Sequence, residues 1–202
     1  MGKIFYLMGK SASGKDSIYK EIKKRFPQLK TVTLYTTRPK REGETEGVEY
    51  HFTDEKGWEA LNAEGKVIET REYHTVCGLW RYFTVDDGQF RLEEQSCLMI
   101  GTLVSYQKLK TYFGDEAVEP LYIEVEDGER LARAVARERA ETEPKYAELC
   151  RRFLADAEDF SEEKIRAAGI RTRYDNREID ACVRDISQKI EKSLFDEGNF
   201  ML

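Results

Sequence analysis

The sequence has few of the residues that build metal centres or covalent crosslinks. Of its 202 residues, only four are cysteine and two are histidine. The four cysteines contain no Cys-x-x-Cys pair, which argues against a zinc site or a disulfide framework and fits a reducing compartment. They are scattered at Cys77, Cys97, Cys150 and Cys182. His51 and His74 lie far apart in the sequence and form no recognisable metal-binding or acid–base set.

Long apolar runs and a surplus of positive charge are also missing. No apolar run approaches the roughly 20 residues of a membrane-spanning helix. The net charge is −6, so a broad surface for nucleic acid or an anionic membrane is not expected. The first residues read as a core strand rather than a signal sequence. We therefore expect a cytoplasmic protein of one domain, with or without a mobile insert, and no nucleic-acid or membrane partner.

What the sequence does contain is a candidate phosphate-binding loop near its start. Residues 9–15 read Gly9-Lys10-Ser11-Ala12-Ser13-Gly14-Lys15, which matches the pattern Gly-x-x-x-x-Gly-Lys. An apolar stretch precedes the loop, and apolar residues with helical spacing follow it, which is the context of a P-loop. Backbone N–H groups of such a loop bind phosphate, and Lys15 would reach the terminal phosphates of a nucleotide. The alternative is a glycine turn ahead of a helix.

The residue after Lys15 departs from the pattern. A Ser or Thr hydroxyl is expected there to bind Mg²⁺, but the chain has Asp16, and the next hydroxyl belongs to Ser17. A carboxylate beside a triphosphate is repelled unless a cation lies between them. One hypothesis is that Asp16 holds Mg²⁺ directly or through water. The other is that Asp16 caps the helix and Ser17 serves the metal.

Apolar runs of strand length alternate with helical stretches along the chain, which predicts an α/β fold with a parallel sheet at its core. Consecutive short strands between residues 35 and 85 predict a small mixed or antiparallel subdomain. Strands are expected at residues 4–8, 31–34, 48–52, 66–76, 79–85, 97–100, 121–125 and 170–174. Helices are expected after the P-loop and at residues 54–62, 103–113, 127–159 with a break near Pro144, 161–169 and 178–195.

The polar segment after residue 35 carries a second candidate site. Arg38 and Arg41 can form a fork around a monophosphate, because a guanidinium group matches phosphate oxygens in a bidentate way. Tyr50 adds a hydroxyl on a rigid ring. Taken alone, the segment is equally compatible with an ordinary solvated loop.

Together with the P-loop, this segment resembles the guanylate kinase family. The shared pattern is T-T-R-P-x-R-x-G-E-x-x-G-x-x-Y-x-F. The resemblance implies that Arg38, Arg41 and Tyr50 hold the phosphate of GMP. It also implies that Glu69, in a stretch similar to the family's base-reading segment, accepts hydrogen bonds from the guanine edge. The alternative for Glu69 is an exposed strand glutamate.

A third set of charged residues follows residue 127. Arg130, Arg133 and Arg137 share one helical face, which is usually just solvated. However, Arg139-Ala-Glu-Thr-Glu followed by two arginines is similar to the lid of the family, which closes over ATP. The resemblance implies that Arg137, Arg139 and one of Arg151 and Arg152, for which we take Arg152, neutralise charge on the transferring phosphoryl group.

The resemblance implies a single P-loop domain of three layers. Its core would comprise residues 1–34, 86–126 and 160–202, its GMP-binding subdomain residues 35–85, and its helical lid residues 127–159. Three departures weaken strict guanine specificity: Leu34 replaces a serine, Cys77-Gly78-Leu79 replaces Tyr-Gly-Thr/Ser, and Gly101-Thr102 ends a strand that usually ends in aspartate. Thr102 is expected to hydrogen-bond the substrate, Asp16 to supply the missing carboxylate, and Tyr82 or Trp80 to pack against the base.

The expected function is ATP-dependent phosphorylation of GMP or dGMP by a monomer or homodimer, with ATP as co-substrate and Mg²⁺ as cofactor. One alternative is a P-loop kinase for another monophosphate or a sugar phosphate. Another is a guanylate-kinase-like interaction module without catalysis. Gly9, Gly14, Lys15 and the lid arginines favour the enzyme.

Overall fold

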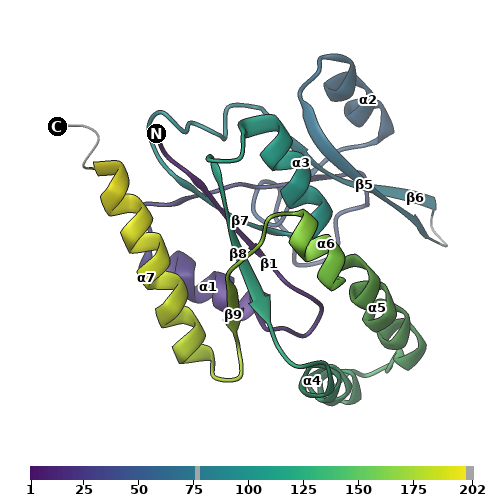
Figure 1. Ribbon diagram of the computed structural model, residues 1–202. Coiled ribbons are helices and arrows are strands. Elements are labelled where there is room, and N and C mark those ends of the chain that lie inside the picture. The colour runs from purple at the N-terminus through teal and green to yellow at the C-terminus, as the bar shows by residue number, and fades with distance from the viewer. Residues whose placement is uncertain (76–77, 199–202) are drawn as a thin grey trace.

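The computed structural model describes residues 1–75 and 78–198 (Figure 1). Cys77, one of the departures noted above, lies outside the described residues. A parallel five-stranded sheet of order β2-β7-β1-β8-β9 forms the core. Its strands are β1 (Ile4–Met8), β2 (Lys30–Thr31), β7 (Cys97–Gly101), β8 (Val118–Glu124) and β9 (Arg173–Asp175).

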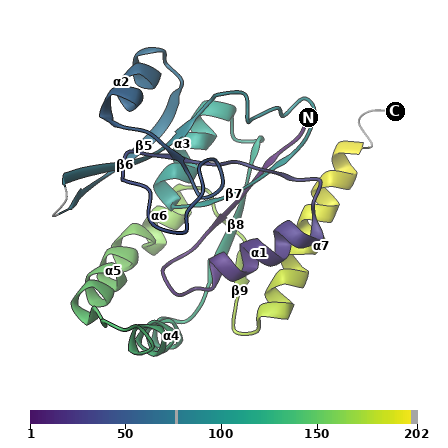
Figure 2. The same cartoon turned by 180° about the vertical axis from the view of Figure 1, so that it is seen from behind.

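Helices cover both faces of this sheet, as the two opposite views show (Figures 1 and 2). Side chains alternate across a strand, so β1 contributes to two separate hydrophobic clusters. Phe5 and Leu7 pack with α1 (Lys15–Arg25) and α7 (Ile179–Gly198). Tyr6, with its neighbours on the same side of β1, packs with α3 (Leu103–Phe113) and α6 (Glu162–Ala167). The three-layer α/β core predicted from the sequence is confirmed.

A smaller mixed sheet of order β4-β3-β6-β5 projects from the core (Figure 1). The β3–β4 pair is parallel, and the other two pairs are antiparallel. Helix α2 (Glu55–Ala63) begins after Asp54, whose carboxylate accepts a hydrogen bond from the Gly57 N–H at 2.8 Å. This sheet confirms the predicted small mixed sheet. Its strands are β3 (Tyr35–Thr36), β4 (His51–Phe52), β5 (Val67–Thr75) and β6 (Gly78–Val85).

Two charged helices lie at the end of the core where β8 leaves the sheet (Figure 1). They are α4 (Asp127–Arg139) and α5 (Tyr146–Asp159), and they are separated by a short turn that contains Pro144. The break in the helical pattern was therefore predicted at the correct place. Among the described residues, no helix combines the length and apolar character that a membrane span needs.

β8 begins at Val118, three residues before its predicted start, and β3 was not predicted. Three further strands differ more from their predicted bounds. The strand expected at 31–34 ends at Thr31, because the Thr33 N–H donates to Gln89 Oε1 at 2.8 Å instead of joining a ladder. Of the strand expected at 48–52, only His51 and Phe52 pair. The strand expected at 170–174 begins at Arg173, because Ile170 is buried in the cluster beside α6.

Candidate functional site

The candidate P-loop joins β1 to α1 and requires both of its glycines. Gly14 has φ +84°, a left-handed conformation that favours glycine. A Cβ at residue 14 would lie 2.3 Å from Asn176 Nδ2, and one at Gly9 would lie 2.7 Å from the Ile123 carbonyl oxygen. The Asn176 side chain also donates to the Ser13 carbonyl at 2.7 Å. The loop is thus fixed in shape by its neighbours, and two of its N–H groups are engaged within the protein: Ser11 N–H donates to Asp156 Oδ2 at 2.8 Å and Ser13 N–H to the Lys10 carbonyl at 3.2 Å.

A buried arginine ties α4 to the P-loop. Arg130 is 1% exposed, and its Nη1 donates to the Ser11 carbonyl oxygen at 2.9 Å. Its Nη2 lies 2.9 Å from Asp127 Oδ1, and its Nη1 lies 3.3 Å from Asp156 Oδ2. From the sequence, Arg130 was predicted only to lie on an arginine-rich helix face. The Asp127–Arg130 spacing of three residues was the signal for the first ion pair, but no sequence signal pointed to Asp156.

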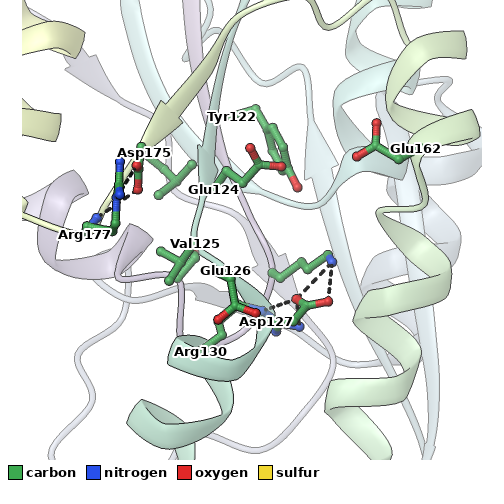
Figure 3. Close-up of a pocket in the computed structure, with 12 residues that line it drawn as sticks. Tyr122, Glu124, Val125, Glu126, Asp127, Arg130, Glu162, Asp175 and Arg177 are labelled. Carbon is green, nitrogen blue, oxygen red and sulfur yellow. Dashed lines mark hydrogen bonds and ion pairs between the residues drawn. The ribbon is translucent and has the colours of Figure 1, made fainter.

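A first cleft of about 490 Å³ opens beside the P-loop, at the carboxyl ends of β8 and β9 (Figure 3). Lys10 and Ser13 line it from the loop. Much of its acidic charge is paired: Asp127 lies 3.2 Å from Lys10 Nζ, and Asp175 lies 2.6 Å from Arg177 Nε. The Ser13 hydroxyl is buried and has no hydrogen-bond partner among the described residues. A ligand oxygen in this cleft would supply the missing partner.

A second cleft of about 360 Å³ lies on the other side of the P-loop, against α1. Lys15 and Asp16 both line it, and Lys15 Nζ lies 3.6 Å from Asp16 Oδ2. Ser17 is exposed and is not among the residues that line this cleft. Of the two candidate metal-binding residues, Asp16 lines this cleft and Ser17 does not.

Thr102 lines the second cleft but also has a structural role. Its Oγ1 accepts a hydrogen bond from the Ser105 N–H at 3.3 Å and so caps α3. The preceding Gly101 leaves space for a neighbouring ring, because a Cβ there would lie 2.0 Å from the Tyr6 hydroxyl. The strand end that lacks an aspartate is therefore occupied by a tyrosine from β1.

The predicted arginine fork is organised by a glutamate. Arg38 is 3% exposed, and its guanidinium forms a bidentate pair with Glu44, with Nη1–Oε2 at 2.8 Å and Nη2–Oε1 at 2.5 Å. The Arg41 N–H donates to the same carboxylate at 2.8 Å. These groups, Arg38 first, lower the pKa of Glu44 to about 2. Glu44 thus joins the Arg38 side chain to the Arg41 backbone and occupies the bidentate face of the Arg38 guanidinium.

A third cleft of about 880 Å³ lies between the β5–β6 hairpin and α5. Arg41 and Tyr50 line it together with the predicted base-packing residues Trp80 and Tyr82. The Tyr50 and Tyr82 rings meet edge to face, with centroids 5.5 Å apart, and burial raises the pKa of Tyr50. The wall of the third cleft therefore combines aromatic side chains with an arginine.

From α5, the third cleft is lined by the neighbouring arginines Arg151 and Arg152. Both pair with Glu148, at 2.7 and 3.0 Å. Arg151 and then Arg152 lower the pKa of Glu148 to about 2. Arg152 also lines a small cavity beside Ser11 with Arg137. Arg139 is exposed at the end of α4 and lines none of these spaces.

Glu69 is buried rather than exposed, so the alternative that it is an ordinary surface glutamate is wrong. It is 5% exposed, and its Oε1 accepts a hydrogen bond from the Thr84 hydroxyl at 2.7 Å. Arg71, which the sequence analysis did not single out, lies beside it, with Nε 3.3 Å from Glu69 Oε2. Arg71 lines both the second and the third cleft.

Comparisons with known proteins find likeness to guanylate kinases. Residues 1–78 match the family model described as guanylate kinase. The guanylate kinase of Thermobifida fusca (strain YX) is 39% identical over 71 residues, which cover 35% of this chain and 36% of that protein. That of Syntrophotalea carbinolica is 37% identical over 76 residues, covering 38% of this chain and 36% of that protein. The matches thus span about a third of the length of these curated relatives.

The structural likeness extends over nearly the whole chain. The crystal structure of guanylate kinase from Anaplasma phagocytophilum matches with a TM-score of 0.62 at 19% identity, over 95% of this chain and 86% of that one. At this identity, the likeness shows the fold alone. The chain thus has the fold of that guanylate kinase, and its sequence at residues 9–15 matches the P-loop pattern. The sequence likeness to the guanylate kinase family is concentrated in residues 1–78.

Proposed function

We propose that the chain transfers the terminal phosphoryl group of ATP to GMP or dGMP. The observation that carries this proposal is the position of the P-loop between two clefts. Lys10 and Ser13 line the first cleft, whereas Lys15 lines the second. Two anionic substrates that enter from opposite sides would therefore meet at one loop of N–H groups and one lysine.

ATP would occupy the first cleft. The P-loop N–H groups and the unpartnered Ser13 hydroxyl would hold its phosphates, and Lys15 would reach the terminal one. Arg137, Arg139 and Arg152 would neutralise charge on the phosphoryl group as residues 127–159 close. An ionised phosphate acceptor needs no general base, so positioning and charge stabilisation are the main tasks of the protein.

The residues beside Lys15 fit a magnesium ion shared with the nucleotide. Mg²⁺ in kinase sites is bound by one or two carboxylates together with substrate phosphates. The Asp16 carboxylate is exposed and lines the second cleft, so it is the group that would hold the ion. When bound, Mg²⁺ supplies neutralising charge for the phosphates. Its presence would explain a carboxylate at this position of a P-loop.

GMP would bind with its phosphate at Arg38, Arg41 and Tyr50. Arg38 would exchange the Glu44 carboxylate for phosphate oxygens, because both present the same bidentate geometry to a guanidinium group. Glu69 would accept hydrogen bonds from the base, and Thr102 would contact the nucleotide from the rim of the second cleft. Movement of residues 35–85 and 127–159 toward the core, residues 1–34, 86–126 and 160–202, would exclude water.

A coupled assay of ADP release with ATP, Mg²⁺ and a panel of acceptors tests the proposal. The panel is GMP, dGMP, AMP, CMP, UMP and IMP. We expect GMP and dGMP to give the highest kcat/KM. Preferred turnover of another acceptor would assign a different monophosphate kinase. Absence of turnover together with absence of ATP binding in a calorimetric titration would indicate an interaction module.

A further inference from the structure

Glu69 and Arg71 form a buried pair where the base of the acceptor nucleotide is proposed to bind, and part of the hydrogen-bonding capacity of this pair is unused. Glu69 Oε2 and Arg71 Nε are both buried, and neither makes a hydrogen bond among the described residues. These two atoms lie 3.3 Å apart without the alignment of a hydrogen bond, while Arg71 Nη2 donates to the other carboxylate oxygen, Glu69 Oε1, at 3.4 Å. Buried polar atoms in native proteins are rarely left in this condition. A ligand that donates to one and accepts from the other would satisfy both.

The second cleft lacks the serine hydroxyl that the family resemblance implies at residue 34. Leu34 lines the second cleft with Arg71 and offers only an apolar side chain. The Thr102 hydroxyl, also on this cleft, is engaged as the cap of α3. Arg71 is therefore a side chain on this wall with N–H donors to offer. Its side chain is 17% exposed, so part of it remains accessible from the cleft.

Guanine presents one acceptor and two donors along the edge that Glu69 would read. They are O6, the N1–H group and the 2-amino group. An arginine that donates to O6 and N7 of guanine is the commonest specific contact in protein–DNA recognition, and a carboxylate accepts from N–H donors. The pair thus offers an acceptor and a donor side by side, as this edge requires.

We propose that Arg71 is a specificity-determining residue that donates to O6 of a 6-oxopurine while Glu69 accepts from N1–H and the 2-amino group. Arg71 takes over the recognition that Leu34 cannot provide. This inference rests on the proposed function, because it assumes that the acceptor is a purine nucleotide with its phosphate near Tyr50 and Arg41. Both of these residues line the third cleft together with Arg71.

The competing account is that Arg71 neutralises Glu69 and fills the base pocket. The two accounts predict opposite effects of shortening the arginine. If Arg71 donates to the base, its loss lowers the affinity for GMP. If Arg71 only fills the base pocket, its loss enlarges the pocket and raises the affinity for GMP.

The test compares GMP with 6-thio-GMP, in which a weak sulfur acceptor replaces O6 and both N–H donors remain. For the wild-type protein we expect kcat/KM for GMP to exceed that for 6-thio-GMP by roughly 10- to 100-fold, the range of a good bidentate base contact. In Arg71→Met this ratio should collapse toward one, through loss of GMP activity. Glu69→Gln is the matched control in the same pair. In this variant, kcat/KM should fall for both GMP and 6-thio-GMP, and the ratio of the two values should stay as in the wild type. The KM for ATP should stay unchanged in both variants.

Two outcomes would overturn the role of Arg71: tighter GMP binding by Arg71→Met, or equal weakening of GMP and 6-thio-GMP in that variant. Equilibrium binding of the two nucleotides, measured by calorimetry, keeps this test separate from catalysis. If the wild-type protein binds GMP with the expected preference but transfers no phosphoryl group, the proposed function fails and Arg71 keeps its role. Circular dichroism spectra matching the wild type show that the variants are folded.

Discussion

Asp156 in the last turn of α5 accepts a hydrogen bond from the Ser11 N–H of the P-loop, with an Oδ2–N distance of 2.8 Å. The same carboxylate oxygen lies 3.3 Å from Nη1 of the buried Arg130. A single side chain therefore joins α5, α4 and the P-loop. Because α5 also carries Arg152, this contact fixes the position of that arginine relative to the loop.

Asp156→Ala should lower the free energy of unfolding by about 1–3 kcal/mol, the usual cost of leaving a buried hydrogen-bonding group without its partner. Arg130 would keep its pairing with Asp127, which limits the loss. Asp156→Asn retains an oxygen for the Ser11 N–H and should lose less. Urea unfolding of the three proteins measures the effect. A denaturation midpoint for Asp156→Ala equal to that of the wild type would contradict the bridging role.

The Arg38–Glu44 pair should make stability depend on acidity. The pKa of Glu44 is lowered to about 2 in the folded protein, against about 4.3 in an unfolded chain. Its contribution is therefore fully present above the unfolded value and is lost as the pH falls through about 2. Glu44→Gln should flatten the decline of stability below pH 5. Glu42→Gln, at an exposed neighbouring position, is the matched control and should leave the decline unchanged. Thermal unfolding between pH 2 and 7 provides the comparison, and identical profiles for wild type and Glu44→Gln would refute this role.

Asp16→Asn and Ser17→Ala separate the two hypotheses for the metal. If Asp16 holds Mg²⁺, its replacement should raise the Mg²⁺ concentration needed for half-maximal activity by about tenfold or more, because a neutral amide is a poorer ligand for this ion. Ser17→Ala should leave that concentration unchanged, since Ser17 lies outside the cleft. Activity is measured against Mg²⁺ at fixed total ATP. The opposite result, with only Ser17→Ala affected, would assign the metal to the hydroxyl.

The fold followed from the sequence wherever local pattern decides structure. The apolar run of β1 and the helical patterns of α1 and α2 act through their immediate neighbours, and these elements lie close to where they were predicted. The short strands were less predictable. Thr33 leaves the sheet because of the Gln89 side chain, 56 residues away, and local sequence contains no information about such a partner.

The site was predictable in its motifs but not in its connections. The loop and the pair Arg38 and Arg41 were candidates from residue types and spacing, and Glu69 from the family resemblance; their roles stay predictions. Their present partners depend on tertiary contacts: Asp156 reaches Ser11 across 145 residues, and Asn176 reaches Ser13 across 163. Arg71 was overlooked because an arginine beside a glutamate on a strand is ordinary in sequence. Its burial against Glu69 becomes visible only in the folded structure.

The most direct test of phosphoryl transfer uses ATP that carries ³²P in its γ-phosphate. The protein is incubated with this ATP, GMP and Mg²⁺, and the nucleotide that carries the label afterwards is identified. The wild-type protein should convert GMP to labelled GDP. Lys15→Ala should slow this by about 10²–10³-fold, the usual cost of removing one group that stabilises transition-state charge, while Lys20→Ala on the exposed side of α1 should behave as wild type. Unchanged unfolding midpoints in both variants would show that the fold is retained. Label that remains in ATP with the wild-type protein, or transfer that persists undiminished in Lys15→Ala, would contradict the account.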